Sequence, residues 1–153
     1  MAMVPFYSRF GDLAFRETRS ATVHGDPAIP DGEYGFVEFY CDDINCDCRR
    51  VLINVISATT GNKVWATINY GWENVAYYEK WTRSKELARE VVGAALDPLN
   101  TQTEYASALL ELFRYALEDK VYVERLRRHY EIFKADLLQS RIKNGNRKRR
   151  KRR

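Results

Sequence analysis

The sequence predicts an α+β protein in which a small antiparallel β-meander of three to four strands packs against two or three C-terminal helices. Three segments in the middle of the chain are rich in aromatic and β-branched residues, as strands are. The second half instead repeats its apolar residues every three or four positions, as helices do. The length of 153 residues suits one domain, and a hydrophobic content of 45% excludes an intrinsically disordered chain.

The N-terminal part of the chain precedes these strands. Residues 5–14 predict a short helix, because Pro5 is tolerated in a first turn. Residues 16–23 are polar and β-branched and predict an edge strand. Residues 24–32 hold two prolines and two glycines and predict a loop.

Three strands are predicted at residues 33–40, 50–58 and 63–70. Gly61 and Asn62 lie between the second and the third, where a hairpin turn favours such residues. The first strand is rich in aromatic residues. One of its faces is expected to carry Tyr34, Phe36, Glu38 and Tyr40.

Three helices are predicted after the sheet. The first is capped by Thr82 or Ser84 and ends at residues 97–100; its apolar face is expected to hold Leu87, Val91 and Ala94 or Ala95. Residues 101–104 match a capping box at the start of the second. That helix is expected to carry Tyr105, Leu109, Leu112, Phe113 and Ala116.

The last predicted helix starts at Asp119 and ends no later than Gly145. Its polar side is expected to carry His129, next to two arginines. Its apolar side is expected to carry Val123, Leu126, Tyr130, Phe133 and Leu137.

The charge of the chain is divided unevenly, and the division predicts a domain at residues 1–140 and a basic tail at residues 141–153. The tail holds nine of the 25 basic residues and no acidic one, which leaves 16 basic and 21 acidic residues in the body. The body is therefore at −5 and the tail at +9. The basic residues of the tail are Arg141, Lys143, Arg147, Lys148, Arg149, Arg150, Lys151, Arg152 and Arg153.

Such a dense run of cations binds phosphates by releasing counterions, largely without regard to base sequence. We therefore expect the tail to bind nucleic acid, either RNA or DNA. The acidic body suits a different partner, such as another protein.

All three cysteines, Cys41, Cys46 and Cys48, lie within eight residues of one another. Thiolates are ligands that zinc prefers, and a tetrahedral site takes four ligands. We expect His24 to be the fourth ligand, with Asp42, Asp43 or Asp47 as weaker choices. The alternative is three reduced thiols without a metal. A disulfide is the least favoured state, because the cytosol is reducing and a C-x-C bridge is strained.

Residues 65–81 contain all three tryptophans. Within them, Tyr70, Trp72 and Glu73 flank Gly71, a position where the backbone can turn, and are expected to bind a protein partner. The alternative is that these aromatic residues form the core between sheet and helices.

Several kinds of function have no support in the sequence. It has no P-loop, no G-x-G-x-x-G, no G-x-S-x-G and no H-E-x-x-H, and no small-molecule substrate can be identified. It has no run of 18 apolar residues and no secretory signal, so we expect a cytoplasmic protein without a membrane span.

Four segments of the chain form a recognisable set: residues 32–51, which include the C-x4-C-x-C cluster, and the shorter segments 70–73, 97–100 and 128–133. Together they resemble a family of small, uncharacterised bacterial proteins with a cysteine cluster. The family carries no assigned activity. Some relatives end in a SEC-C motif, a cysteine-rich zinc hook; this chain has its basic tail in that place. The resemblance implies that the C-terminal appendage is a docking element in both.

Three functional hypotheses remain at this stage. The first is a non-enzymatic adaptor, stabilised by zinc, whose tail holds nucleic acid and whose body binds a protein. The second is a small metal-dependent enzyme in which the cysteine and aspartate cluster is the active site. The third is an acidic protein that neutralises a partner and uses its tail only as an anchor.

Overall fold

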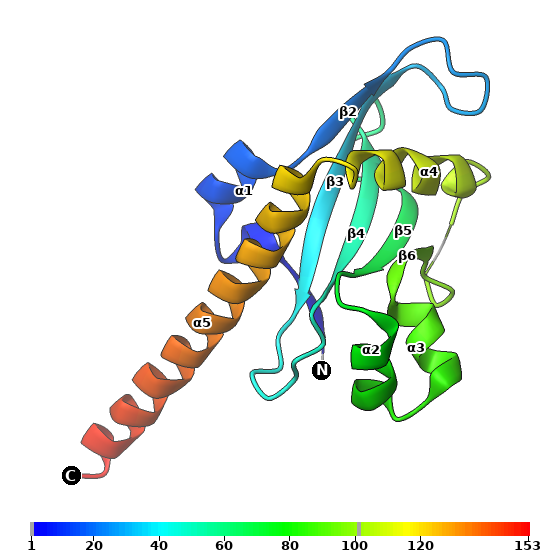
Figure 1. Cartoon of the computed structure of the whole chain (residues 1–153). Helices are drawn as coiled ribbons and strands as arrows, with labels where there is room; N and C mark the ends of the chain where they lie inside the picture. The colour runs from blue at the N-terminus through cyan, green and yellow to red at the C-terminus, as the bar shows by residue number, and fades with distance from the viewer. Residues whose placement is uncertain (1, 101) are drawn as a thin grey trace.

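The computed structural model describes residues 2–100 and 102–153 and confirms the α+β class (Figure 1). In this part of the chain one antiparallel sheet contains six strands. The strands are β1 (Met3–Pro5), β2 (Ser20–Val23), β3 (Gly32–Cys41), β4 (Arg50–Ser57), β5 (Val64–Gly71) and β6 (Gly93–Leu96). The helices are the 3-10 turn η1 (Phe6–Ser8), α1 (Gly11–Glu17), α2 (Val75–Thr82), α3 (Lys85–Val91), α4 (Ala106–Ala116) and α5 (Lys120–Lys151).

The predicted meander is the centre of this sheet. The strand order is β1-β3-β4-β5-β6, and β2 pairs with the first half of β3 on the edge where β1 pairs with its last residues. The predicted inner face of β3 is confirmed, because its four alternate side chains are buried, Glu38 among them. Gly61 has a φ of 64°, as the tight turn between β4 and β5 requires.

The core lies between this face of the sheet and the helices α4 and α5. Rings from the two layers meet edge to face or tilted, with centroids 5.3 Å apart for Phe36 and Phe113 and 5.8 Å apart for Tyr40 and Phe133. Such contacts add to the free energy gained by removing apolar surface from water. The fully buried residues contributed by the two helices include Leu109, Phe113, Tyr122, Leu126 and Phe133.

The predicted helix at residues 5–14 is wrong in its position. Residues 3–5 form β1 instead, in which Met3 pairs with Cys41, and the helical turns begin afterwards. The last residues of β3 offer a free sheet edge, and pairing with that edge outweighs the local preference of Pro5 for a helix start. Because α1 extends to Glu17, the predicted edge strand is shortened to β2.

The first predicted helix after the sheet is correct at its start and wrong at its end. The side chain of Ser84 accepts a hydrogen bond from the N–H of Leu87, as expected of a cap. The helix α3 then stops at Val91, and Ala94 lies in β6, paired with Tyr70. The side chain of Leu87 is exposed, whereas Ala88 is buried.

The predicted capping box does not start α4, which begins only at Ala106. Thr101 lies outside the described residues. The next residue, Gln102, instead binds β5. Its side chain accepts a hydrogen bond from the N–H of Thr67 and donates one to the carbonyl of Thr67, both at 2.9 Å.

The helix α2, which is capped by Asn74, was not predicted as an element of its own.

The last helix begins as predicted, because the Asp119 side chain accepts a hydrogen bond from the N–H of Val121 at 3.0 Å. Its predicted end at Gly145 is wrong, since α5 continues to Lys151. Lysine and arginine have high helix propensity, and a single glycine costs only about 1 kcal/mol against them. None of the described helices has an apolar stretch long enough to cross a membrane.

Candidate metal centre and basic helix

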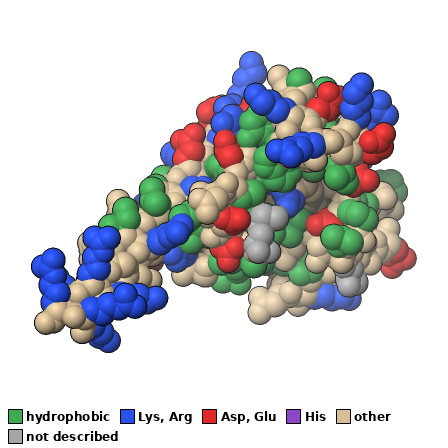
Figure 2. Space-filling model, turned by 90° about the horizontal axis from the view of Figure 1, so that it is seen from below, with side chains coloured by type: hydrophobic (Ala, Val, Ile, Leu, Met, Phe, Trp, Pro, Cys, Tyr) green, Lys and Arg blue, Asp and Glu red, His purple; other side chains and the backbone are tan. Residues whose placement is uncertain are grey.

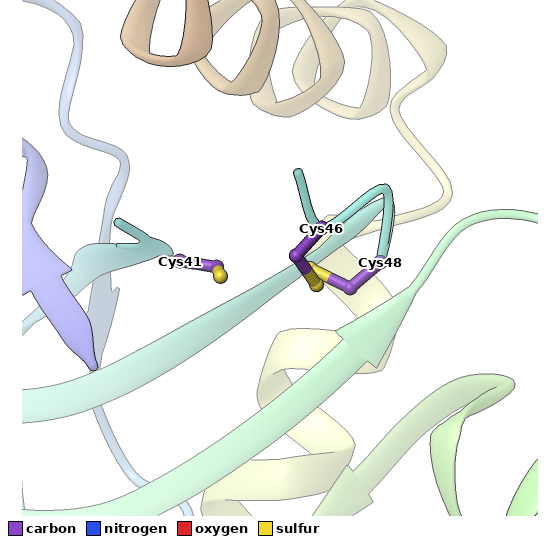
Figure 3. A group of neighbouring side chains, drawn as sticks. All are labelled: Cys41, Cys46 and Cys48. Atoms are coloured by element: carbon purple, nitrogen blue, oxygen red, sulfur yellow. The ribbon is translucent and has the colours of Figure 1, made fainter. Parts of the chain in front are cut away.

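The three cysteines come together where β3 crosses over to β4. Cys41 ends β3, and the other two lie in the loop at residues 42–49. A turn folds this loop back, because the carbonyl of Asp43 accepts a hydrogen bond from the N–H of Cys46 at 3.1 Å. All three Sγ atoms lie within 4.8 Å of one another (Figure 3). Three thiols at such separations can hold one metal ion.

Burial favours the protonated form of two of these thiols, Cys46 and Cys48, because it raises their pKa values. Cys41 and Cys48 are buried and Cys46 is half-buried. Burial and then the two neighbouring thiols raise the pKa of Cys46 to about 12. A thiol must lose its proton to become a ligand, so metal binding at this cluster must release protons.

The surroundings of the cluster also contain groups that stabilise thiolates. The backbone N–H of Asp43 donates a hydrogen bond to Sγ of Cys41 at 3.4 Å. Burial raises the pKa of Cys48, but the positive charges of Arg50 and Lys134 and the backbone N–H of Arg50 act in the opposite direction. Donors and cations directed at sulfur are the outer interactions that a metal–thiolate centre needs.

Two side chains of α5 form hydrogen bonds with the cysteine loop. Lys134 donates a hydrogen bond from Nζ to the carbonyl of Asp43 at 2.6 Å. The hydroxyl of Tyr130 donates to Oδ1 of Asp47 and accepts from the N–H of Arg49, both at 3.3 Å. A change in the shape of this loop is therefore transmitted to α5.

The prediction that His24 is the fourth ligand is wrong. His24 follows β2 beside the start of β3, whereas Cys41 ends β3, and a strand of ten residues spans about 33 Å. The imidazole of His24 is exposed, and its Nδ1 lies 3.1 Å from Oδ2 of Asp31.

The three aspartates of the cysteine loop bind partners other than the thiols. Asp42 accepts a hydrogen bond from the N–H of Ala2, and Asp43 accepts one from the N–H of Asn45, both at 2.9 Å. Asp47 pairs with Arg49 at 2.9 Å. The group that can hold a metal, within the described part of the chain, consists of the three cysteines alone.

The predicted basic tail forms the free end of α5. This end extends beyond the body, and basic side chains surround it (Figures 1 and 2). All residues from 141 to 153 are exposed, and no acidic residue follows Asp136. Seven of the nine cations named above therefore lie on an exposed stretch of helix, and Arg152 and Arg153 follow its end.

The predicted partner surface is more deeply packed than expected. The ring of Tyr70 lies 6.0 Å from that of Phe113, and the ring of Trp72 lies 5.2 Å from that of Tyr130. These half-buried rings complete the core, as in the alternative interpretation. Trp72 and Glu73 also line a depression of about 320 Å³. Binding of a protein at this place stays a prediction.

The structure also contains a buried ionic group that the sequence did not predict. His129 is fully buried, not on the polar side of α5, and its two ring nitrogens face Glu38 and Glu17. The N–H of one ring nitrogen and the hydroxyl of Tyr40 reach the same oxygen of Glu38, at 2.7 and 2.6 Å. A glutamate on an otherwise apolar strand face was the available signal, because a buried carboxylate needs a partner.

Comparison with protein-family models, with curated proteins and with solved structures gives no match for this chain. The class of the protein therefore follows from its fold and its cysteine cluster. In the described part of the chain it is an α+β protein with a six-stranded antiparallel sheet and three cysteines that could hold a metal ion.

Proposed function

We propose that the protein is a non-enzymatic adaptor that binds nucleic acid through the free end of α5 and contains a structural zinc–thiolate centre. One observation supports this proposal: the helix that contacts the cysteine loop also continues into the basic end of the chain. Its residues Tyr130 and Lys134 contact the cysteine loop, and its residues 141–153 carry nine cations. A metal that fixes the loop would thereby fix the direction in which the basic end extends.

Zinc fits the donor set better than the other common cations. Calcium and magnesium require oxygen ligands, whereas thiolates select zinc and other thiophilic ions. Three thiolates and one Zn²⁺ carry a net charge of −1. The nearby cations Arg50 and Lys134, which act on the pKa of Cys48, would compensate that charge.

Nucleic acid fits the basic end because it supplies a regular series of phosphates. Nine cations without an intervening acid, all in solvent, release many counterions when they bind such a polymer. The acidic body repels the same polymer, and its surface is therefore available to a protein partner. The depression next to Trp72 and Glu73 is the place for that partner.

The alternative of a metal-dependent enzyme has less support. Such an enzyme needs an acid or base at the metal, but Asp42, Asp43 and Asp47 each hold a backbone amide or an arginine. Their substitution is therefore expected to affect the loop and not a reaction.

The experiment compares the full chain with residues 1–140. Fluorescence anisotropy would measure the binding of labelled RNA and DNA of one sequence, each of about 20 nucleotides, longer than most single-strand sites. We expect the full chain to bind both, with an affinity that falls at least about tenfold between about 50 and 200 mM salt, and the shorter chain to lose nearly all binding.

A matched variant controls for charge in general. Lys80, Lys85 and Arg89 are exposed cations of α2 and α3, and their replacement by glutamine should leave binding nearly unchanged. Thermal unfolding would check that residues 1–140 keep their core, since the removed residues are all exposed. Equal binding by both chains would contradict the proposal and assign the polymer to the body.

A further inference from the structure

Arg9 brings a cation of the body onto one face of α5. It lies between η1 and α1, far from the tail in sequence. Its guanidinium donates from Nε to Oδ2 of Asp136 at 2.7 Å and from Nη2 to Oγ of Ser140 at 3.1 Å. The side chain is thus held against the helix shortly before the basic end begins.

This contact forms one wall of a depression of about 590 Å³. The other wall is a single face of α5, because Ser140, Lys143, Arg147 and Arg150 follow one another at intervals of three and four residues. The depression is therefore lined by four cations from two parts of the chain. Its other lining residues are asparagines, and no carboxylate is among them.

We infer that this groove, formed by Arg9 with Lys143, Arg147 and Arg150, is the phosphate-binding site of the protein. The inference rests on the proposed function and makes it specific. The phosphodiester backbone of a nucleic acid follows this face of α5 toward the body and meets Arg9 at its end. Arginine suits the role, because its planar guanidinium binds phosphate oxygens in pairs.

The groove separates the cations of the tail into two groups of unequal importance. Lys143, Arg147 and Arg150 line it. Arg141, Lys148 and Arg149 of α5 point away from this face, because each residue advances the direction by about 100°. A tail that acted only through its total charge would use both groups equally.

The test removes the same charge from either side of α5 in the full chain. One variant replaces Lys143, Arg147 and Arg150 by glutamine, and the matched variant replaces Arg141, Lys148 and Arg149. Binding of the two labelled oligonucleotides is measured across the salt range. The groove variant should lose about tenfold more affinity than its match, and its salt slope should fall by about 2. Equal losses would overturn the inference and leave only general charge attraction.

A second pair of variants tests the contribution of the body. Arg9→Gln should lower the salt slope by about 1, whereas Arg16→Gln, an exposed cation of α1 outside the groove, should not. Asp136→Asn removes the negative charge beside Arg9 but keeps an oxygen that can accept its hydrogen bond, so Arg9 stays at the groove and the variant should bind at least as well as the unaltered chain. Loss of binding in Asp136→Asn would mean that Arg9 acts only by packing and would contradict its role at the phosphate.

The two arms with RNA and DNA show whether the groove distinguishes the sugars. Equal affinities indicate contacts to phosphates alone, as inferred. If the unaltered chain binds neither oligonucleotide, the proposed function fails together with the groove. If it binds both and the matched triple variants behave alike, only the groove fails.

Discussion

His129 of α5 and Glu38 of β3 meet inside the core, where Nδ1 of the imidazole lies 2.7 Å from Oε1 of the carboxylate. The second ring nitrogen faces Oε1 of Glu17 at 3.0 Å, and the ring of Phe6 stacks on the imidazole at 4.2 Å. Three elements distant in sequence, α1, β3 and α5, are thereby joined at one side chain. The imidazole lies between two carboxyl groups, and its contacts with them raise the pKa of His129 against the opposing effect of burial.

Replacement of His129 by glutamine should strongly destabilise the fold, because the buried carboxyl group of Glu38 would lose its partner. Removal of one partner of a buried pair costs about 3–5 kcal/mol. Urea unfolding monitored by circular dichroism would measure the change. The double variant with Glu38→Gln, which removes both charges, should recover part of the lost stability; additive losses would show that the pair does not interact.

The same histidine predicts how stability depends on pH. Burial would lower the pKa of His129, but the hydrogen bonds and charges of Glu38 and Glu17 outweigh it, so the pKa lies above its usual 6.5. The stabilisation is therefore complete below pH 6.5 and is lost as the pH rises through the raised value. Unfolding experiments at increasing pH should show this loss in the unaltered chain. The His129→Gln variant should not show it.

Glu17 predicts a second loss of stability, on the acid side. The hydrogen bond from His129, followed by contacts with Arg128, keeps the pKa of Glu17 below 4.5. Its contribution is present above pH 4.5 and disappears as the pH falls through the lowered value. A Glu17→Gln variant should therefore be less stable than the unaltered chain near neutral pH, and the difference should shrink in acid. A constant difference across that range would contradict the ion pair.

The metal centre predicts that zinc affinity rises with pH. The thiols of Cys46 and Cys48 have raised pKa values and must release protons on binding. Elemental analysis should find one zinc per chain, and Cys46→Ser should abolish it. His24→Ala is the matched control and should keep the metal. Calorimetry in buffers of different ionisation enthalpy would count the protons released, and zinc binding without proton release would contradict thiolate ligation.

Replacement by alanine should have opposite effects on stability at Gly71 and at Gly145. A Cβ on Gly71 would lie 2.6 Å from the Tyr78 hydroxyl and would also collide with the carbonyl of Val91. Gly71→Ala should cost about 1–3 kcal/mol of stability. Gly145 has no atom within 4 Å of such a Cβ, so Gly145→Ala should raise the helix content without affecting the core. Circular dichroism during urea unfolding measures both effects.

The centre of the sheet could be predicted from the sequence because β3, β4 and β5 are rich in aromatic and β-branched residues, and because alternate residues of β3 form one aromatic face. The strand β6 was missed, because its residues 93–96 are glycine, alanines and leucine, without a β-branched residue. It forms because Tyr70 and its neighbours on β5 offer a free edge. The apolar residues of α3 recur at helical spacing, and Ala94 and Ala95 continue that spacing. Their extended conformation comes from pairing with β5, which the spacing does not express.

For the candidate site, the sequence predicted the three thiols and not their surroundings. Cysteines separated by a few residues can meet through a local turn, so their spacing in the sequence predicts that they lie together. His24 and Cys41 lie at opposite ends of β3, and this separation depends on strand pairing that the sequence does not show. His129 was placed on the polar side because arginines precede it, yet the crossing of α5 over β3 directs it inward.

The length of α5 carries the far end of the basic segment beyond the reach of the charge of the body. From Ser140, which touches the body through Arg9, to Arg150 the helix advances about 15 Å, whereas salt at physiological strength screens charges beyond about 8 Å. The calculated pI of 9.0 thus describes neither part. At neutral pH we expect the chain to be retained by anion-exchange and by cation-exchange resins alike, each holding it by a different end.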